Sequence, residues 1–163
     1  MKYVFAILLI LAVAFIVRSL FFSTSANAAA GSFSDIGPYF NALSDAKNNN
    51  AFLVVTIKGT EDFFQFKHYE DGTFEIDFPL ITERQQSLED RVKTAHSDLG
   101  LSYELTESSD GSRFIDVYTK MTSEEISGAV KDLFRKVFLS TQATELTFHW
   151  DGFELPDPAN PQI

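Results

Sequence analysis

The chain has 163 residues and a formal net charge of −10 at pH 7. Only two of its 13 basic residues, Lys2 and Arg18, precede residue 31, whereas all 23 acidic residues follow it, so the remainder carries a formal charge of −12. Such a surface repels phosphate backbones and anionic lipid, which excludes nucleic-acid binding and docking through basic patches. Cysteine is absent, so disulfides, thiolate metal sites and thiol nucleophiles are excluded as well.

The N-terminus indicates where the protein works. Residues 4–17 form an unbroken apolar run, and residues 20–22 extend it after two polar positions. One interpretation is a cleaved signal peptide, with Lys2 as its charged start and a small-x-small site that predicts cleavage after Ala28. Residues 1–22 are then a targeting segment that the mature protein lacks.

The second interpretation is an uncleaved membrane anchor. Residues 4–22 are 19 residues long, close to the roughly 20 that span the hydrocarbon core. Arg18 would snorkel to the interface, and in a signal peptide its charge would oppose translocation. Both interpretations predict export, because Lys2 and the free amino group outweigh Arg18 under the positive-inside rule. We expect either a single-pass bacterial inner-membrane protein with a periplasmic domain, or a periplasmic or secreted protein.

Two segments without core-forming patterns flank one predicted domain. Residues 23–34 are small and polar, which predicts a flexible linker. Residues 154–163 contain three prolines and predict a disordered tail. Residues 35–153 between them are long enough to bury a single core.

Apolar periodicity and breaker residues predict three helices and six strands within that domain. Helical segments repeat apolar residues every three or four positions, whereas strands are rich in branched and aromatic residues. Thr82 with Gln85, and Thr122 with Glu125, have the spacing of capping boxes and mark two helix starts. The predicted helices are 35–48, 83–99 and 123–139, and the predicted strands are 51–58, 62–69, 73–78, 101–107, 113–119 and 145–150.

The Asp71-Gly72 pair determines the register of the first hairpin. A two-residue turn there would place Phe66 opposite Asp77 and mix apolar with charged residues on one face. A three-residue loop places Phe66 opposite Ile76 instead, and the polar residues Gln65 and Asp77 then face each other on the other side. Only this register sorts the two faces, and it requires glycine in the left-handed conformation.

The second hairpin, over 101–119, places one carboxylate opposite another. The same three-residue loop pairs Leu105 with Ile115 on the face that the helices cover, and Glu104 with Asp116 on the other face. Like charges opposite one another cost stability unless they are solvated or bridged by a cation. Two carboxylates are too few for a calcium site, so we interpret the pair as part of an exposed acidic face.

The predicted fold is α+β: an antiparallel sheet of five to six strands, with helices packed on one face and an N-terminal hydrophobic targeting helix in front. Its order is helix, three strands, helix, two strands, helix. With the segments DGTFEI at 71–76 and SEEI at 123–126, this order resembles the type III secretion chaperone-like fold, including the YbjN-like and tyrosine-chaperone-like bacterial domains.

The resemblance covers 35–150, and the chain departs from it in two places. Residues 94–99 stand where YbjN-like domains carry an Asn-containing segment, and the N-terminal segment is unusual for a mostly cytosolic family. The resemblance implies protein binding rather than catalysis, often as a dimer. It transfers no site residue to this chain.

A search for reactive groups predicts no catalytic, cofactor-binding or metal-binding residue. His68, His96 and His149 are far apart and lack metal-ligand spacing. We expect His68 in the core and His96 at the surface. Nucleophile-elbow, phosphate-loop and dinucleotide-binding motifs do not occur. We therefore expect neither a cofactor nor enzymatic activity.

Aromatic residues are the remaining unusual feature, with 17 phenylalanines in the chain. Most occupy inward positions, but Phe52, Phe63 and Phe114 do not, and Tyr118 shares the face of Phe114. Packing at the edge of the core is one explanation, and an exposed patch that binds a partner is the other. On the second interpretation, Phe114 and Tyr118 are the predicted partner-binding residues.

Two functions from different classes follow. The first is a non-enzymatic protein-binding domain, chaperone-like or scaffolding, that holds a protein partner or a second copy of itself. The second is a small-ligand-binding or enzymatic domain whose site the sequence does not reveal. The lack of clustered His, Cys or nucleophile motifs favours the first.

Overall fold

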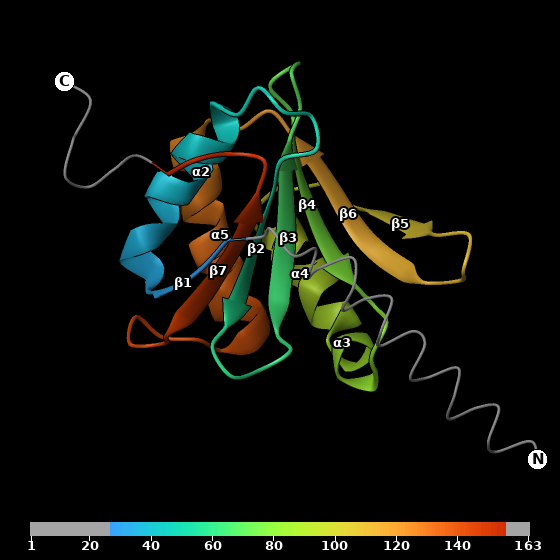
Figure 1. Cartoon of the computed structure of the whole chain (residues 1–163). Helices are drawn as coiled ribbons and strands as arrows, with labels where there is room; N and C mark the ends of the chain where they lie inside the picture. Colours follow the sequence, from blue (N-terminus) through green and yellow to red (C-terminus); the bar gives the residue numbers. More distant parts are fainter. Residues whose placement is uncertain (1–26, 156–163) are drawn as a thin grey trace, which may run out of the picture.

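The computed structural model describes residues 27–155, which form a sheet covered by helices (Figure 1). The strands are β1 (Asn27–Gly31), β2 (Phe52–Ile57), β3 (Phe63–His68), β4 (Phe74–Pro79), β5 (Glu104–Glu107), β6 (Arg113–Thr119) and β7 (Leu146–Asp151). The helices are the 3-10 helix η1 (Phe33–Asp35), α2 (Ile36–Ser44), α3 (Glu83–Ser87), α4 (Glu89–Asp98) and α5 (Ser123–Phe138).

All described strands belong to one antiparallel sheet in the order β1-β7-β2-β3-β4-β6-β5. The predicted α+β class is confirmed, but the prediction of five to six strands is wrong, because the sheet has seven. The predicted targeting segment at 1–22 lies outside the described residues, as does the predicted tail from 156 onward. Between 27 and 155, no helix combines the length and the apolar character needed to cross a membrane.

The core lies between the helices and one face of the sheet, where aromatic rings from both layers interlock. The rings of Phe40 (α2) and Phe66 (β3) are 4.9 Å apart, and those of Phe134 (α5) and Phe64 (β3) are 5.6 Å apart. Figure 1 shows α2 and α5 stacked together on this side of the sheet. Burial of these rings contributes strongly to the apolar stabilisation, since an aromatic side chain buries roughly 150–250 Å².

Part of the predicted flexible linker over 23–34 is a strand instead: residues 27–31 form β1. Residues 27–31 pair with β7, from Asn27 opposite Trp150 to Gly31 opposite Leu146. A strand of Asn, Ala and Gly has neither apolar alternation nor branched residues, so local sequence does not mark it. Pairing with β7 provides its hydrogen bonds, and close packing requires small residues, because a Cβ on Gly31 would lie 2.9 Å from the ring of Phe148.

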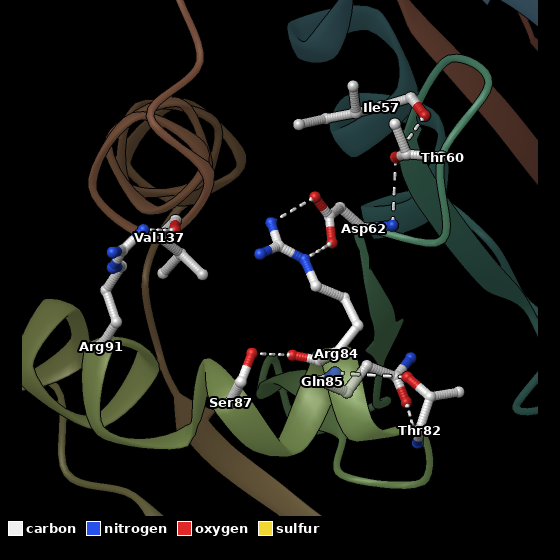
Figure 2. Close-up of polar contacts among 9 residues, drawn as sticks. All are labelled: Ile57, Thr60, Asp62, Thr82, Arg84, Gln85, Ser87, Arg91 and Val137. Atoms are coloured by element: carbon white, nitrogen blue, oxygen red, sulfur yellow. Dashed lines mark hydrogen bonds and ion pairs between the residues drawn. The ribbon is translucent and has the colours of Figure 1, made fainter.

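The helix predicted over 83–99 is interrupted at Leu88, which is the C-cap of α3 and the N-cap of α4. The two halves are attached to different parts of the fold (Figure 2). In α3, Arg84 forms two hydrogen bonds of 3.1 and 3.0 Å to the buried carboxylate of Asp62, in the β2–β3 turn. In α4, Arg91 donates to the carbonyl of Val137 in α5. Both capping boxes are present as predicted.

The predicted register of both hairpins is confirmed. Gln65 lies opposite Asp77, and Leu105 lies opposite Ile115. Gly72 and Gly111 have φ angles of +82° and +84°, the left-handed values that the three-residue loops require.

The prediction that His96 lies at the surface is wrong, because its side chain is fully buried. The apolar stripe of α4 marks only one buried side of the helix. The helix is flanked by α5 as well as by the sheet, and His96 packs edge-on against Phe64 with the ring centroids 6.2 Å apart.

Candidate functional site

The face of the sheet opposite these helices, called the open face below, carries one continuous row of cross-strand neighbours. Each member lies directly opposite the next on the adjoining strand. The row is Ala28, His149, Val54, Gln65, Asp77, Asp116 and Glu104. Its last three members, from β4, β6 and β5, are carboxylates, and together with Glu75 they are called the carboxylate cluster below.

Glu75 is held at the centre of this cluster by three donors. The hydroxyl of Tyr69 donates a hydrogen bond to it, and that of Tyr118 donates a longer one of 3.4 Å. The ammonium of Lys67 lies 3.5 Å from one carboxylate oxygen. Only 7% of Glu75 is exposed, so these groups replace the water that the carboxylate would otherwise bind.

Asp116 and Asp77 are less completely satisfied. Thr106 on β5 donates a 2.6 Å hydrogen bond to one oxygen of Asp116. One buried oxygen of Asp77 accepts no hydrogen bond from any residue that the structure describes. The predicted exposed acidic face is therefore wrong for Asp116, which is 6% exposed, and correct for Glu104, which is exposed.

Burial and mutual repulsion change the ionisation of this cluster. Burial, with the neighbouring charges of Asp116 and Glu75, raises the pKa of Asp77 to about 7. Burial also raises the pKa of Asp116, and it raises the pKa of Tyr118 to about 12 with help from Glu75. Asp77 consequently keeps its proton until the pH approaches about 7, whereas an isolated aspartate loses it at about pH 4.

The predicted partner-binding residues lie beside this cluster. Phe114 and Tyr118 flank Asp116 on β6, and both project on the open face as expected. Tyr118 is 49% exposed, whereas Phe114 is half-buried beside Pro79. The aromatic pair and the cluster therefore form one surface.

The polar groups of this surface are carboxylates and hydroxyls that form hydrogen bonds with one another. Within 27–155, no three His, Cys, Asp or Glu residues are placed to hold a metal ion. The histidines are not brought together either: His96 is in the core, and His68 contacts the ring of Phe74 at 4.5 Å. Of the four carboxylates in the cluster, only Glu104 is exposed, and it can accept hydrogen bonds from ammonium, guanidinium or amide groups of a partner.

Sequence reasoning found parts of the cluster but missed its continuity. The hairpin registers placed Asp77 opposite Gln65 and Asp116 opposite Glu104. Their union depends on β4 lying next to β6, which the sequence did not reveal. The alternating polar residues of β4 were the available signal, because they show that its second face is not covered by apolar packing.

No family model matches the chain, and no match was found among curated proteins or solved structures. The resemblance to chaperone-like domains stays a prediction.

Proposed function

We propose that the chain is a non-enzymatic protein-binding domain, chaperone-like or scaffolding, that works outside the bacterial cytoplasm and binds a partner through the open face. One observation carries the proposal. A half-exposed aromatic side chain, Tyr118, lies over a carboxylate cluster on the face that α2, α4 and α5 do not pack against.

Tyr118 and Phe114 have the properties of interface anchors. Tyrosine offers a large contact area with few rotatable bonds, and its hydroxyl already bonds Glu75. Such partly rigid aromatics dominate binding energy in many interfaces. The exposed Glu104 and the negative charge of the buried carboxylates behind it would favour a partner with basic residues, because complementary charge steers association and disfavours like-charged partners. The formal charge of −12 after residue 30 favours the same kind of partner.

The apolar segment at 4–22 supports the location. As an uncleaved anchor it would keep the domain at the inner membrane on the periplasmic side, and as a signal peptide it would release it. In either case the partner is a protein outside the cytoplasm or a second copy of the chain, and nucleic acid is not expected.

A second candidate function is favoured by Asp77 alone. A carboxyl with a pKa of about 7 and an unpartnered oxygen has the properties of a general acid in an enzyme or of a small-ligand contact. Asp77→Asn separates the two functions. It should abolish turnover or ligand binding under the second, whereas it should leave binding of a protein that contacts Tyr118 within about threefold under the first.

The direct test is site-specific photo-crosslinking of the full chain in bacterial cells. A photoreactive phenylalanine analogue at Tyr118 should give a discrete crosslinked species, which mass spectrometry of the adduct would identify as a partner or a second copy. The same analogue at Glu124, which is exposed on α5, is the control and should not give that species. Equal yields at both positions would contradict a role for the open face.

A further inference from the structure

The two edges of the sheet differ, and the edge at β5 has features of a binding site. β5 is the last strand of the sheet and pairs with β6 alone, at the end of the sheet away from α2 (Figure 1). Among the strands that the structure describes, only β6 pairs with it, and it is only four residues long. An unpaired strand edge offers a row of backbone donors and acceptors to an additional strand.

The register shows which backbone groups point outward. Ser108 N–H donates to Ser112 C=O, so this pair is a hydrogen-bonded one. Hydrogen-bonded and non-hydrogen-bonded pairs alternate along an antiparallel ladder. Leu105 and Glu107 therefore occupy non-hydrogen-bonded positions toward β6, and their N–H and C=O groups face away from the sheet.

The side chains on the two faces of β5 differ in character. On the face that the helices cover, Leu105 is 50% exposed, and Tyr103 just before the strand is 37% exposed. On the open face, Glu104 is exposed beside Asp116, and Thr106 bonds Asp116. An added strand would therefore meet an apolar strip on one side and carboxylates on the other.

Charge decides between a second copy of the chain and a different partner. A second copy would bring another domain of formal charge −12 and another Glu104 to the same edge. Acidic residues at an edge oppose such self-pairing. Glu104 is the last member of the row of cross-strand neighbours. A strand with basic residues would place a positive charge next to it, and opposite charges at neighbouring cross-strand positions attract.

We propose that β5 binds an extended segment of a partner protein, by strand addition, in which basic residues alternate with aliphatic ones. The basic side chains lie on the open face next to Glu104, and the aliphatic ones cover Leu105 and Tyr103. Backbone bonds to Leu105 and Glu107 hold the segment. This inference rests on the proposed protein-binding function and specifies the chemistry of the partner.

The probe is a short fluorescent peptide in which lysine alternates with valine, titrated against the full chain in neutral detergent micelles. We expect it to bind at least tenfold more tightly than a peptide in which glutamate alternates with valine, and to weaken with added salt. Alternate N–H groups of the bound peptide point toward β5 and away from it. N-methylation of the set that points toward β5 should abolish binding, whereas N-methylation of the other set should not. Equal binding of the lysine and glutamate peptides would overturn the proposal.

Two variants test the site itself. Leu105→Pro removes an outward N–H and leaves the ladder to β6 intact, so it should abolish peptide binding with little change in melting temperature. Glu104→Lys, which does not depend on how proline is tolerated, should shift the preference toward the glutamate peptide. Unchanged binding by both variants would overturn the proposal. A dimer of the wild type that Leu105→Pro dissociates would show that a second copy occupies the edge, which also overturns it.

Failure here is distinguishable from failure of the proposed function. If the crosslink at Tyr118 persists in Leu105→Pro, the open face binds a partner without strand addition at β5. If the crosslink is absent in the wild type but the lysine peptide binds, the edge acts without the open face.

Discussion

Asp77 on β4 lies directly opposite Asp116 on β6, at a position where the two strands do not exchange backbone hydrogen bonds. Side chains approach most closely at such positions. The two largely buried carboxylates therefore repel each other when both are ionised, and a proton retained by Asp77 relieves the repulsion. This arrangement makes stability depend on pH.

The first prediction is that Asp77→Asn stabilises the protein at alkaline pH. The pKa of Asp77 is about 7 in the folded state and ~4 when unfolded, so the folded state binds more protons between these values. Its ionisation therefore lowers the free energy of unfolding as pH rises from about 4 to about 7. Urea denaturation at pH 8 should show the variant more stable by a few kcal/mol, with the difference shrinking toward pH 4.

Asp110→Asn is the control, because it should change the free energy of unfolding in the opposite direction. Hydrogen bonds from Ser108 and Ser112 lower the pKa of Asp110 in the second hairpin loop. Its ionised form therefore stabilises the fold above its unfolded pKa, and that contribution disappears as pH falls through the folded pKa. The variant should be less stable at neutral pH and match the wild type in acid. A shift of the same sign in both variants would contradict this account of the carboxylate cluster.

The second prediction concerns the hairpin loops. Gly72→Val should destabilise the protein by about 1 kcal/mol or more, because valine is strained at a φ of +82°, even though no atom lies within 4 Å of the position that a Cβ would take there. Gly111→Val should behave alike. The control Gly128→Ala, in the exposed part of α5 with equal space, should stabilise by ~0.5–1 kcal/mol. Thermal denaturation distinguishes the signs.

The third prediction concerns the ion pair that attaches α3 to the β2–β3 turn (Figure 2). Arg84→Met leaves the buried carboxylate of Asp62 without its bidentate partner and should cost about 1–2 kcal/mol. Lys58→Met is the matched control. Lys58 is as exposed as Arg84, at 53% of the side chain, but its partner Glu145 is also exposed. Its loss should stay within about 0.5 kcal/mol, and equal losses would argue against a specific role for Asp62.

The fourth prediction separates interface from core at the open face. The double variant Phe114→Ser/Tyr118→Ser should weaken partner association by at least tenfold and retain cooperative unfolding, because neither side chain is fully buried. Leu139→Ser is the control, since Leu139 is exposed at the end of α5. Association is measured by the yield of crosslinks from a reactive group on β5. An unfolded double variant would show that these residues belong to the core.

The fifth prediction is export. A reporter that is active only outside the cytoplasm, fused after Ile163, should be active, because the positive-inside rule places the domain there. Mass spectrometry of the mature N-terminus then separates anchor from signal peptide. A protein that starts at Ala29 would rule out the anchor and would lack two of the residues that pair with β7. Activity from a cytoplasm-only reporter at the same position would refute export.

Features that depend on neighbouring residues could be predicted from the amino-acid sequence. Register at Gly72 and Gly111, and the helix starts at Thr82 and Thr122, follow from turn and capping chemistry that acts over three or four positions. Apolar alternation likewise predicted which face of each hairpin is buried, and it placed Phe114 on the open face.

Features that depend on residues distant in the sequence could not be predicted and are known only from the tertiary structure. β1 forms because the edge of β7 provides its hydrogen bonds. The carboxylate cluster forms because β4 lies beside β6, and His96 is buried because α5 flanks α4. The physical reason is the range of the forces involved. Turn and cap energies are local, whereas strand order and helix contacts depend on how the whole chain closes around one core, which no short segment specifies.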